Sequence, residues 1–559
     1  MNRKAGPSGY YLLIISLLFA ACQSAEKPKD KDIVETPERF EVRVSNNIKS
    51  TLPFILNNKG RLNDSVILVR DSLTELIYSK KDYQPLWCRQ EGWLPIGDSL
   101  FSFIDHAEQY GLFATDYHYR ALNGVRQLIA TDSIARKDAA LWSRADLMLT
   151  DAFALICKHL KQGRLNYDSV TLRTDSVLTD SFYLANFDQL QQSGDVRALF
   201  HQLEPRYEGY ESLKTGLKWF LDSIGTFKRY TRVTYPNKDS ANLYATLQRR
   251  FFEEDIVPSP SAPMDTAAWR KAFTDYQTKN NLKVTGRVNE NTVNSLNNTS
   301  WEKFKRAAIN LDRFKLLPDT LPTTYIWVNI PSYSLQVVDS SLEVITSRVI
   351  VGQPKTRTPL LTSQVSNFIT YPQWTVPYSI IFKEMLPQIQ KSTKYLAKEN
   401  LMVVDKNDSI INPDSINWHR LSKKYFPYQL KQRQGDDNSL GVLKFNFPNK
   451  YSVYLHDTNA RWLFSKSNRA LSHGCVRVKE FKKLADFLVR NDTLKYHPDT
   501  LRNWIKREEK HVVSGFKRVP LYIRYFTCEG KDGKLVFYDD IYGEDKLLRE
   551  RYFADKVMR

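Results

Sequence analysis

The sequence predicts a multidomain α+β protein, with helical domains in the first part of the chain and a mainly β domain in the last part. The length of 559 residues corresponds to roughly three or four domains, and 42% apolar residues suffice for real cores. Between about residues 40 and 300, apolar residues recur at helical spacing. Beyond Leu321 they alternate with polar residues, which is typical of half-buried strands.

Residues 1–21 carry the features of a secretory signal peptide. Arg3 and Lys4 precede an uncharged apolar run from Tyr10 to Ala21, shorter than the roughly 20 residues that a membrane span needs. The ending FAAC resembles the lipobox of bacterial lipoproteins and predicts lipidation of Cys22; an ordinary signal peptide is the alternative. We therefore expect a lipoprotein of the cell envelope that is anchored to a membrane and faces the periplasm.

Residues 22–39 are predicted to form a flexible tether, because they are charged and contain Pro but no aromatic residue. The formal net charge of the chain is +19, yet Lys and Arg are scattered rather than clustered. This indicates compatibility with an anionic polymer or lipid surface, and we expect no nucleic-acid partner. The cysteines beyond Cys22 are too widely spaced for a disulfide framework, so a free thiol is plausible. They are Cys88, Cys157, Cys475 and Cys528.

A mainly helical scaffold domain is predicted for residues 40–240. The segments 98–112 and 141–163 show the helical spacing most clearly, and Cys157 lies on the apolar face of the second, where we expect a core residue. Residues 241–300 form a separate helical unit, with Phe273, Tyr276 and Gln277 on one expected helix. The pattern F-x-x-Y-Q followed by L-x-x-T-G-x-V-N resembles the small three-helix peptidoglycan-binding domain of many wall enzymes; a generic helical hairpin is the alternative. A linker helix is expected at 301–320.

Residues 321–559 are predicted to form the mainly β domain. Alternating segments such as TYIWVNIPSYSLQVVD, VLKFNFPN and YSVYLHD are separated by turn-forming residues. A polar stretch with helical pieces interrupts the strands at about 378–434, and insertions of this size usually cover a functional site, so we predict an inserted helical cap. The tail at 519–540 is predicted to add two strands to the same sheet, with Cys528 in a structural role.

The candidate catalytic residues of the chain lie around Cys475, which belongs to the segment RALSHGCVRVKEF (469–481). His456 ends a predicted strand on the face opposite Leu455, and His473 lies two residues before the cysteine. A nucleophilic thiol needs a base, which imidazole supplies. It also needs donors for an oxyanion, which backbone N–H groups around Gly474 and Cys475 could provide.

A metal site would use the same three side chains. A catalytic zinc site normally needs three protein ligands and a second shell, and the chain contains no HExxH helix and no CxxC pair. We therefore expect neither a metal nor another cofactor.

The segment His456-Asp457-Thr458 followed by Ser472-His473-Gly474-Cys475-Val476-Arg477 resembles the signature H-x(14–17)-[ST]-H-G-C-h-[NR] of bacterial L,D-transpeptidases. Residues 328–337, 349–361, 371–380 and 438–458 also resemble blocks of that catalytic domain. The helical region, the wall-binding module and the cap resemble the large Gram-negative members of the family.

The resemblance implies a cysteine acyltransferase that makes 3→3 cross-links in peptidoglycan. Cys475 would attack the carbonyl between meso-diaminopimelate and D-Ala of a tetrapeptide stem, release D-Ala and form a thioester. The amine of a second stem then takes the acyl group. The implied partners are stem tetrapeptides and glycan strands.

The resemblance also implies roles for the neighbours of Cys475. His456 is the predicted base, His473 is a second candidate that could instead shape the pocket, and Gly474 contributes its backbone. Ser472 is expected to fix a ring by a hydrogen bond, and Arg477 to hold a substrate carboxylate as a planar fork. The remaining predicted substrate-binding residues are Asp457, Trp374 and Tyr378, with packing within the cap as the alternative for the last two.

Two other functions remain open at this level. On the same fold, water could take the thioester, giving an L,D-carboxypeptidase or a hydrolase that detaches wall proteins. A non-catalytic wall-binding scaffold would also use the tether and the binding module, although the intact pair of His456 and Cys475 argues against it.

Overall fold

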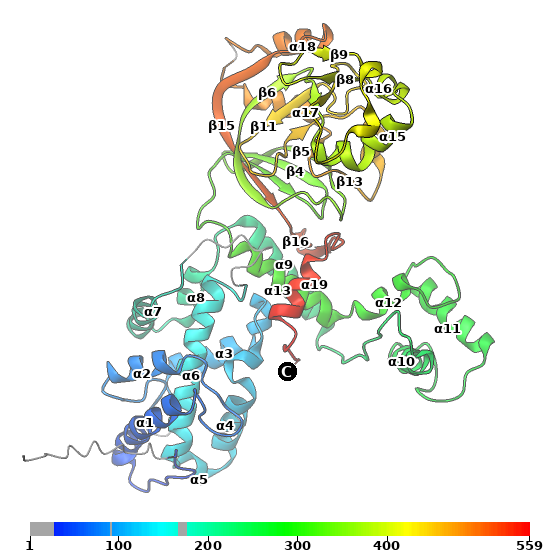
Figure 1. Ribbon diagram of the computed structural model, residues 1–559. Coiled ribbons are helices and arrows are strands. Elements are labelled where there is room, and N and C mark those ends of the chain that lie inside the picture. The colour runs from blue at the N-terminus through cyan, green and yellow to red at the C-terminus, as the bar shows by residue number, and fades with distance from the viewer. Residues whose placement is uncertain (1–26, 90–91, 166–175, 493, 559) are drawn as a thin grey trace, which may run out of the picture. The chain divides into compact units, whose positions relative to one another are not determined.

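The computed structural model describes residues 27–89, 92–165, 176–492 and 494–558 (Figure 1). It confirms the predicted α+β architecture, with mainly helices before residue 325 and mainly strands beyond it. The chain divides into two compact units: residues up to 105, 114–157 and 179–199 form the first, and residues 106–113, 158–178 and 200–559 form the second. The predicted signal peptide and Cys22 lie outside the described residues. Within the described part of the chain, no helix combines the length and the apolarity that crossing a membrane requires.

The first unit is built on helices whose apolar faces form its core. In α6 (Ala139–Lys161), whose last residues belong to the second unit, Leu147, Ile156 and Cys157 are completely buried, as the helical spacing predicted. The other elements are η1 (Pro37–Arg39), α1 (Phe40–Asn57), α2 (Asp71–Ser79), β1 (Cys88–Arg89), β2 (Gly92–Trp93), α3 (Pro95–Asp105), η3 (Ala114–Tyr117), α4 (Tyr119–Thr131), α5 (Ser133–Arg136), α7 (Asp180–Ser193) and the start of α8 (Val196–Leu203).

The tether predicted for residues 22–39 is wrong over its last part. Asp32 and Val34 are buried, and Asp32 accepts hydrogen bonds from the side chains of Arg43 and Asn47. The Val34 N–H also donates to the carbonyl of Lys137. The charged composition suggested a free segment, but Asp32 finds partners on α1 that offset its burial.

A helical core in the second unit surrounds α13 (Ser300–Phe314), which was predicted to be a linker helix. Phe304, Ile309 and Leu311 are completely buried there. The same core contains α9 (Glu208–Ile224), α19 (Glu544–Tyr552) and residues of the hairpin β16 (Cys528–Lys531) and β17 (Lys534–Phe537). Among the described strands the hairpin pairs only with itself, so the prediction that both tail strands join the main sheet is wrong for this part. Cys528 is completely buried.

Residues 240–297 contain three helices around a small core of their own: α10 (Ser240–Glu253), α11 (Thr266–Lys279) and α12 (Glu290–Asn297). Phe273 and Tyr276 are buried in this core. The Gln277 side chain is also buried, and its amide binds the Thr285 and Gly286 N–H groups and the Thr292 hydroxyl. Gln277 on α11 therefore binds both the turn at Thr285 and the helix α12.

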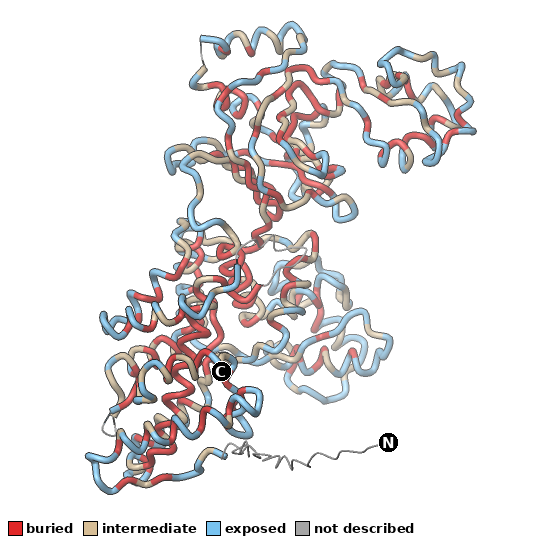
Figure 2. Tube along the Cα trace, turned by 60° about the vertical axis from the view of Figure 1, so that its left-hand side comes forward, coloured by how far each residue is buried: buried red, intermediate tan, exposed pale blue. Residues whose placement is uncertain are grey.

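The catalytic domain predicted from residue 321 is a nine-stranded sheet that closes on itself. Its strand order is β13-β5-β14-β12-β11-β6-β15-β3-β4, and β4 pairs again with β5. The buried stretches in Figure 2 follow the strands and inner helix faces, while loops are mostly exposed. The strands are β3 (Tyr325–Asn329), β4 (Ser334–Asp339), β5 (Leu342–Gly352), β6 (Leu361–Thr370), β11 (Leu443–Asn446), β12 (Leu455–His456), β13 (Ala470–Ser472), β14 (Val476–Val478) and β15 (Val512–Arg524). Helices α17 (Phe481–Leu488) and α18 (Pro498–Lys506) contribute to the same core.

The inserted cap has its own hydrophobic core, but it is not purely helical as predicted. A four-stranded antiparallel sheet with the order β7-β10-β8-β9 accompanies the helices. Its strands are β7 (Trp374–Thr375), β8 (Leu401–Val404), β9 (Ile410–Ile411) and β10 (Gln429–Gln432). The helical elements are α14 (Tyr378–Ile380), the π-helical η4 (Ile381–Met385), α15 (Leu386–Lys391), α16 (Lys394–Lys398), η5 (Pro413–Ser415) and η6 (Trp418–Arg420).

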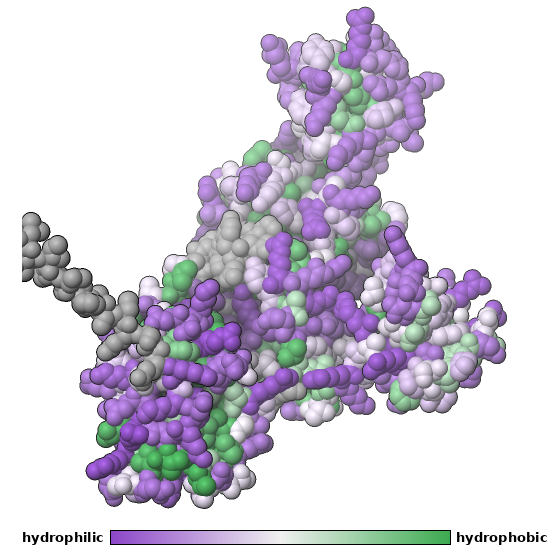
Figure 3. All heavy atoms as spheres, turned by 60° about the horizontal axis from the view of Figure 1, so that its bottom comes forward, coloured by the Kyte–Doolittle hydropathy of each residue, from purple (hydrophilic) through white to green (hydrophobic). Residues whose placement is uncertain are grey.

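The face of the surface seen in Figure 3 is mostly hydrophilic, with apolar side chains in small groups. This agrees with a chain that carries 81 basic and 62 acidic residues. Such a surface presents charged side chains of both signs to solvent, while the cores described above bury the apolar residues.

Candidate functional site

The predicted nucleophile Cys475 lies in the turn between β13 and β14. β14 pairs in parallel with β12, and the Val476 N–H donates to the Tyr454 carbonyl at 3.1 Å, which extends this ladder back to Cys475. Side chains alternate between the two faces of a strand. Leu455 and Val476 belong to the hydrophobic core, so His456 and Cys475 lie together on the opposite face.

Two basic residues flank His456 on the neighbouring strands. The strand register places Lys444 of β11 and Arg477 of β14 directly opposite it, one on each side. Burial lowers the pKa of both cations, and neither forms an ion pair with a carboxylate among the described residues. The Arg477 Nε is buried without a hydrogen-bond partner in the described chain. This arrangement leaves positive charge available for an anion that enters the site.

His456 is buried and electrically neutral at physiological pH. Burial, together with the positive charge of Arg477, lowers its pKa to about 3, although the backbone carbonyls of Asp457 and Leu440 act in the opposite direction. Its Nδ1 makes no hydrogen bond within the described residues. A neutral imidazole on the same face as the thiol can accept a proton, as a general base requires.

Burial raises the pKa of the Cys475 thiol above its ordinary value. Hydrogen bonds from Tyr454 and the charges of Lys444 and Arg477 act in the opposite direction. Tyr454 also stacks edge-on against His456, with ring centroids 5.5 Å apart, and lies under the Lys444 ammonium at 4.2 Å. The resting site therefore contains a thiol and a neutral imidazole, surrounded by groups that stabilise a thiolate once it forms.

Lys444 and Tyr454 were not predicted from the sequence. The signal was present in the strand alternation, because Lys444 falls between the core residues Leu443 and Phe445, and Tyr454 precedes the core residue Leu455. Both residues therefore share the face of His456.

Ser472 and Gly474 shape the turn that carries Cys475. The Ser472 hydroxyl donates to the Cys475 carbonyl at 2.6 Å and accepts from the Gly474 N–H at 3.1 Å. Gly474 has a φ of +122°, which L side chains rarely adopt. Ser472 thus binds backbone atoms rather than the predicted ring, and the Gly474 N–H, expected to help an oxyanion, already has an acceptor.

His473 points toward the cap rather than toward the thiol. Its Nε2 donates to Oε1 of Glu384 in η4 at 2.9 Å, and both side chains are about half exposed. This contact joins the turn that carries Cys475 to the cap. A ring that acts as the base for Cys475 would not be bound to Glu384, so this contact argues against that role for His473.

Asp457, which was predicted to bind substrate, has its carboxylate engaged within the protein. Its side chain is completely buried. The carboxylate accepts the Val442 N–H at 3.0 Å and the Arg461 guanidinium through both oxygens. Asp457 therefore fixes the loop before β11 to the end of β12.

The two aromatic residues at the mouth of the cap differ in their surroundings. Burial raises the pKa of the Tyr454 hydroxyl and the Trp374 indole acts in the opposite direction, so Trp374 lies near the group beside Cys475. Tyr378 stacks on Phe382 at 5.9 Å and contacts Phe426, which is packing within the cap. The structure brings Trp374 to the site and leaves Tyr378 in the cap.

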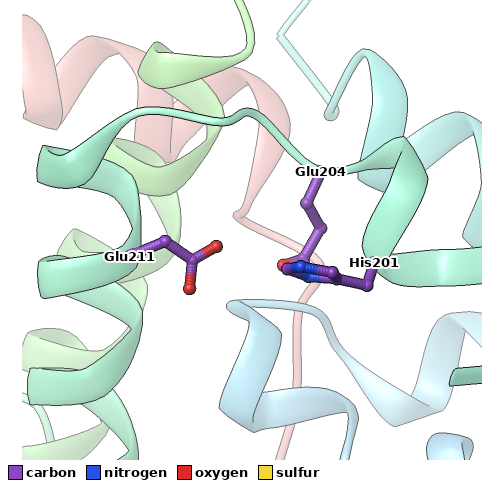
Figure 4. A group of neighbouring side chains, drawn as sticks. All are labelled: His201, Glu204 and Glu211. Atoms are coloured by element: carbon purple, nitrogen blue, oxygen red, sulfur yellow. The ribbon is translucent and has the colours of Figure 1, made fainter. Parts of the chain in front are cut away.

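A cluster of possible metal ligands lies away from this site, at His201, Glu204 and Glu211 (Figure 4). The Lys214 ammonium already binds both carboxylates, at 2.9 Å from Glu204 and 3.1 Å from Glu211. A cation is thus supplied by the chain itself, and the cluster gives no reason to add a metal ion.

Residues 323–498 match the family of the L,D-transpeptidase catalytic domain, and residues 72–217 match a scaffold domain. A Haemophilus influenzae protein named "Putative L,D-transpeptidase" is 35% identical over 245 residues, which are 44% of this chain and 49% of that protein. The chain therefore spans about half the length of this curated relative.

The crystal structure of an L,D-transpeptidase from Stackebrandtia nassauensis covers 53% of this chain and 95% of its own, at 11% identity and a TM-score of 0.16. A TM-score this low carries no argument about the fold. The sequence matches, the position of Cys475 in the turn before β14 and that of His456 on β12 lead to one conclusion. Residues 323–498 of this chain are an L,D-transpeptidase catalytic domain.

Proposed function

We propose that this protein forms 3→3 cross-links in peptidoglycan through a thioester on Cys475. The observation that carries the proposal is the placement of the thiol, the neutral His456 and two unpaired cations on one face of neighbouring strands. This set can generate a nucleophile, move its proton and receive a charged substrate.

In the first half of the reaction, the Cys475 sulfur attacks the carbonyl between diaminopimelate and D-Ala while His456 takes the thiol proton. The tetrahedral intermediate then collapses, the carbon–nitrogen bond breaks, and His456 returns the proton to the leaving D-Ala amine. In the second half, the diaminopimelate amine of another stem attacks the thioester. His456 accepts the amine proton and gives it to the departing sulfur, which restores the thiol.

Lys444 and Arg477 supply the recognition of the donor. The D-Ala of a tetrapeptide ends in a free carboxylate one carbon beyond the scissile amide. An unpaired guanidinium and an unpaired ammonium beside the thiol can neutralise this charge, and a partly buried, charge-assisted contact is stronger than an exposed one. In this proposal Arg477 has the role predicted from the sequence, and Lys444 shares it.

We also propose that the protein acts from the cell envelope, attached through a lipid on Cys22, and that residues 240–297 bind peptidoglycan. The lipobox-like sequence supports the first point and the separate three-helix core supports the second. Incorporation of labelled palmitate that persists in Cys22→Ser would contradict the anchor. Unchanged cosedimentation with insoluble peptidoglycan after replacing residues 240–297 by a short linker would contradict the binding role.

The test of the catalytic proposal is the product formed from disaccharide tetrapeptides by the full-length protein. Mass spectrometry should show 3→3 dimers and released D-Ala, and Cys475→Ala should form neither. Tripeptide monomers without dimers would assign the protein to the hydrolases instead. Full activity of Cys475→Ala would reject the mechanism.

A further inference from the structure

The loop after β5 forms hydrogen bonds with the turn between β13 and β14 that carries Cys475, which we call the nucleophile turn. The Gln353 N–H and the Thr356 hydroxyl both donate to the Ser472 carbonyl, at 2.9 Å and 3.0 Å. The Thr358 hydroxyl donates to the Gly474 carbonyl at 2.8 Å, in a fully buried bond. Two threonines of one loop thus bind two different peptide groups of the turn.

The Gly474 carbonyl belongs to the same peptide unit as the Cys475 N–H. A trans peptide is planar, with its C=O and N–H on opposite sides. A bond that fixes the carbonyl therefore also fixes the direction of the N–H. The neighbouring N–H groups are occupied, since that of Gly474 binds Ser472 and that of Val476 binds Tyr454. The Cys475 N–H has no acceptor among the described residues.

We propose that Thr358 and Tyr542 are positioning residues that aim the Cys475 N–H at the oxyanion of the tetrahedral intermediate. This proposal rests on acyl transfer through Cys475 as proposed above. An oxyanion donor is effective only when it already points to the place where the negative charge develops. Thr358 provides that orientation through the Gly474–Cys475 peptide plane, and it does not touch the substrate.

Tyr542 fixes Thr358 in turn. Its hydroxyl donates to the Gly352 carbonyl at 2.7 Å and accepts the Thr358 N–H at 3.1 Å. The Thr358 hydroxyl also accepts the Gly352 N–H at 2.9 Å. A Cβ on Gly352 would lie 2.1 Å from the Thr356 carbonyl oxygen, so the loop can close this tightly only around glycine. All of these bonds are buried, which makes each one costly to leave unmade.

Tyr542 comes from outside residues 323–498, in the segment between β17 and α19. Its ring stacks on Tyr525 with centroids 5.6 Å apart, and its N–H donates to the Tyr525 hydroxyl at 2.9 Å. That hydroxyl donates to Asp540 at 2.7 Å. The C-terminal segment therefore reaches the nucleophile turn through a continuous series of hydrogen bonds.

The experiment compares two reactions of the same thiol in the full-length protein. Alkylation by iodoacetamide displaces iodide and forms no oxyanion, whereas acylation by a carbapenem passes through a tetrahedral oxyanion. Both reactions begin from the same thiolate, so their ratio isolates the contribution of the oxyanion donor. Intact-protein mass spectrometry measures both rates at one pH.

Thr358→Val and Tyr542→Phe should lower the acylation rate relative to alkylation, Thr358→Val by about tenfold or more, since loss of an oxyanion donor costs about 10²–10³. Thr358→Ser keeps the hydroxyl and should restore the ratio to within about threefold of the unaltered protein. Thr356→Val is the matched control, because it removes the same kind of bond from the Ser472 carbonyl and leaves the Gly474–Cys475 peptide alone.

An unchanged ratio in Thr358→Val, or an equal loss in Thr356→Val, would overturn the proposal. If Thr358→Val does not fold, Tyr542→Phe decides, since it keeps the ring and removes only the hydroxyl; an unchanged ratio there also overturns it. The outcome is separate from that of the proposed function, because acylation by a carbapenem requires no peptidoglycan product.

Discussion

The protonation state of the resting site can be tested by changing the pH. Burial raises the pKa of the Cys475 thiol above its ordinary value, and burial with the charge of Arg477 lowers that of His456 to about 3. Near neutral pH the thiol is therefore protonated and the imidazole is neutral. At pH 7 the thiolate fraction lies below the few per cent of a free thiol, whose pKa is about 8.5.

The thiolate is the reactive species, so its fraction sets the alkylation rate. While the pH stays below the pKa of the thiol, each pH unit increases this fraction tenfold. Raising the pH from 6 to 8 should therefore accelerate alkylation of Cys475 about 100-fold. A thiolate–imidazolium pair formed at rest would instead give a rate that hardly depends on pH in this range.

The assay is iodoacetamide labelling of the full-length protein, followed by digestion and mass spectrometry of the Cys475 peptide. Cys88, Cys157 and Cys528 are buried, so their slow labelling in the same samples reports whether the fold stays intact. A change of less than about threefold between pH 6 and 8 would refute the neutral pair. The mechanism would then begin from a preformed ion pair.

Four further substitutions follow from the same structure. His456→Ala should slow transpeptidation by about 10²–10⁴-fold, the usual effect of losing a general base. His473→Ala should cost less than about tenfold, since that ring binds Glu384; a reversed order of the two losses would make His473 the base. Asp457→Asn should lower the free energy of unfolding by about 1.5–3 kcal/mol, measured with urea, because it weakens a buried charge-assisted contact. Phe304→Ala should cost about 3–5 kcal/mol, whereas a true linker helix would lose far less.

Much of the fold could be predicted because the spacing of apolar residues within each helix or strand indicates its type. The burial of Leu147, Ile156 and Cys157 in α6 follows directly from helical spacing. The alternation around Leu455 likewise placed His456 on the face opposite the core. These patterns are local, so a single sequence suffices to read them.

The errors concern residues whose surroundings come from distant parts of the chain. Asp32 looked like part of a tether because its partners, Arg43 and Asn47, lie on a helix that follows it. The hairpin at Cys528 has strand periodicity, but periodicity does not tell which partner a strand finds, and this one packs with α9 and α13. Secondary structure was therefore easier to predict than tertiary partners.

The same difference between local sequence patterns and distant partners applies to the residues of the site. Cys475 and His456 stand out by residue type and spacing, whereas Lys444 matters only because the strand register places it opposite His456. Asp457 directly follows the signature histidine His456, yet its carboxylate binds the loop before β11 through the Val442 N–H. Residue type suggested which groups carry chemistry, and only the register and hydrogen bonds separate those that face the thiol from those that support the fold.

The most direct test of the account is to isolate the acyl-enzyme. The full-length protein would be incubated with a disaccharide tetrapeptide whose diaminopimelate amine is acetylated, so that no acceptor amine is present, and the reaction stopped in acid. We predict an adduct of the donor minus D-Ala on the Cys475 peptide, one D-Ala released per adduct, and no adduct in Cys475→Ala. Cross-linking of the unblocked substrate without any adduct on Cys475, or with the adduct on another residue, would contradict the central claim.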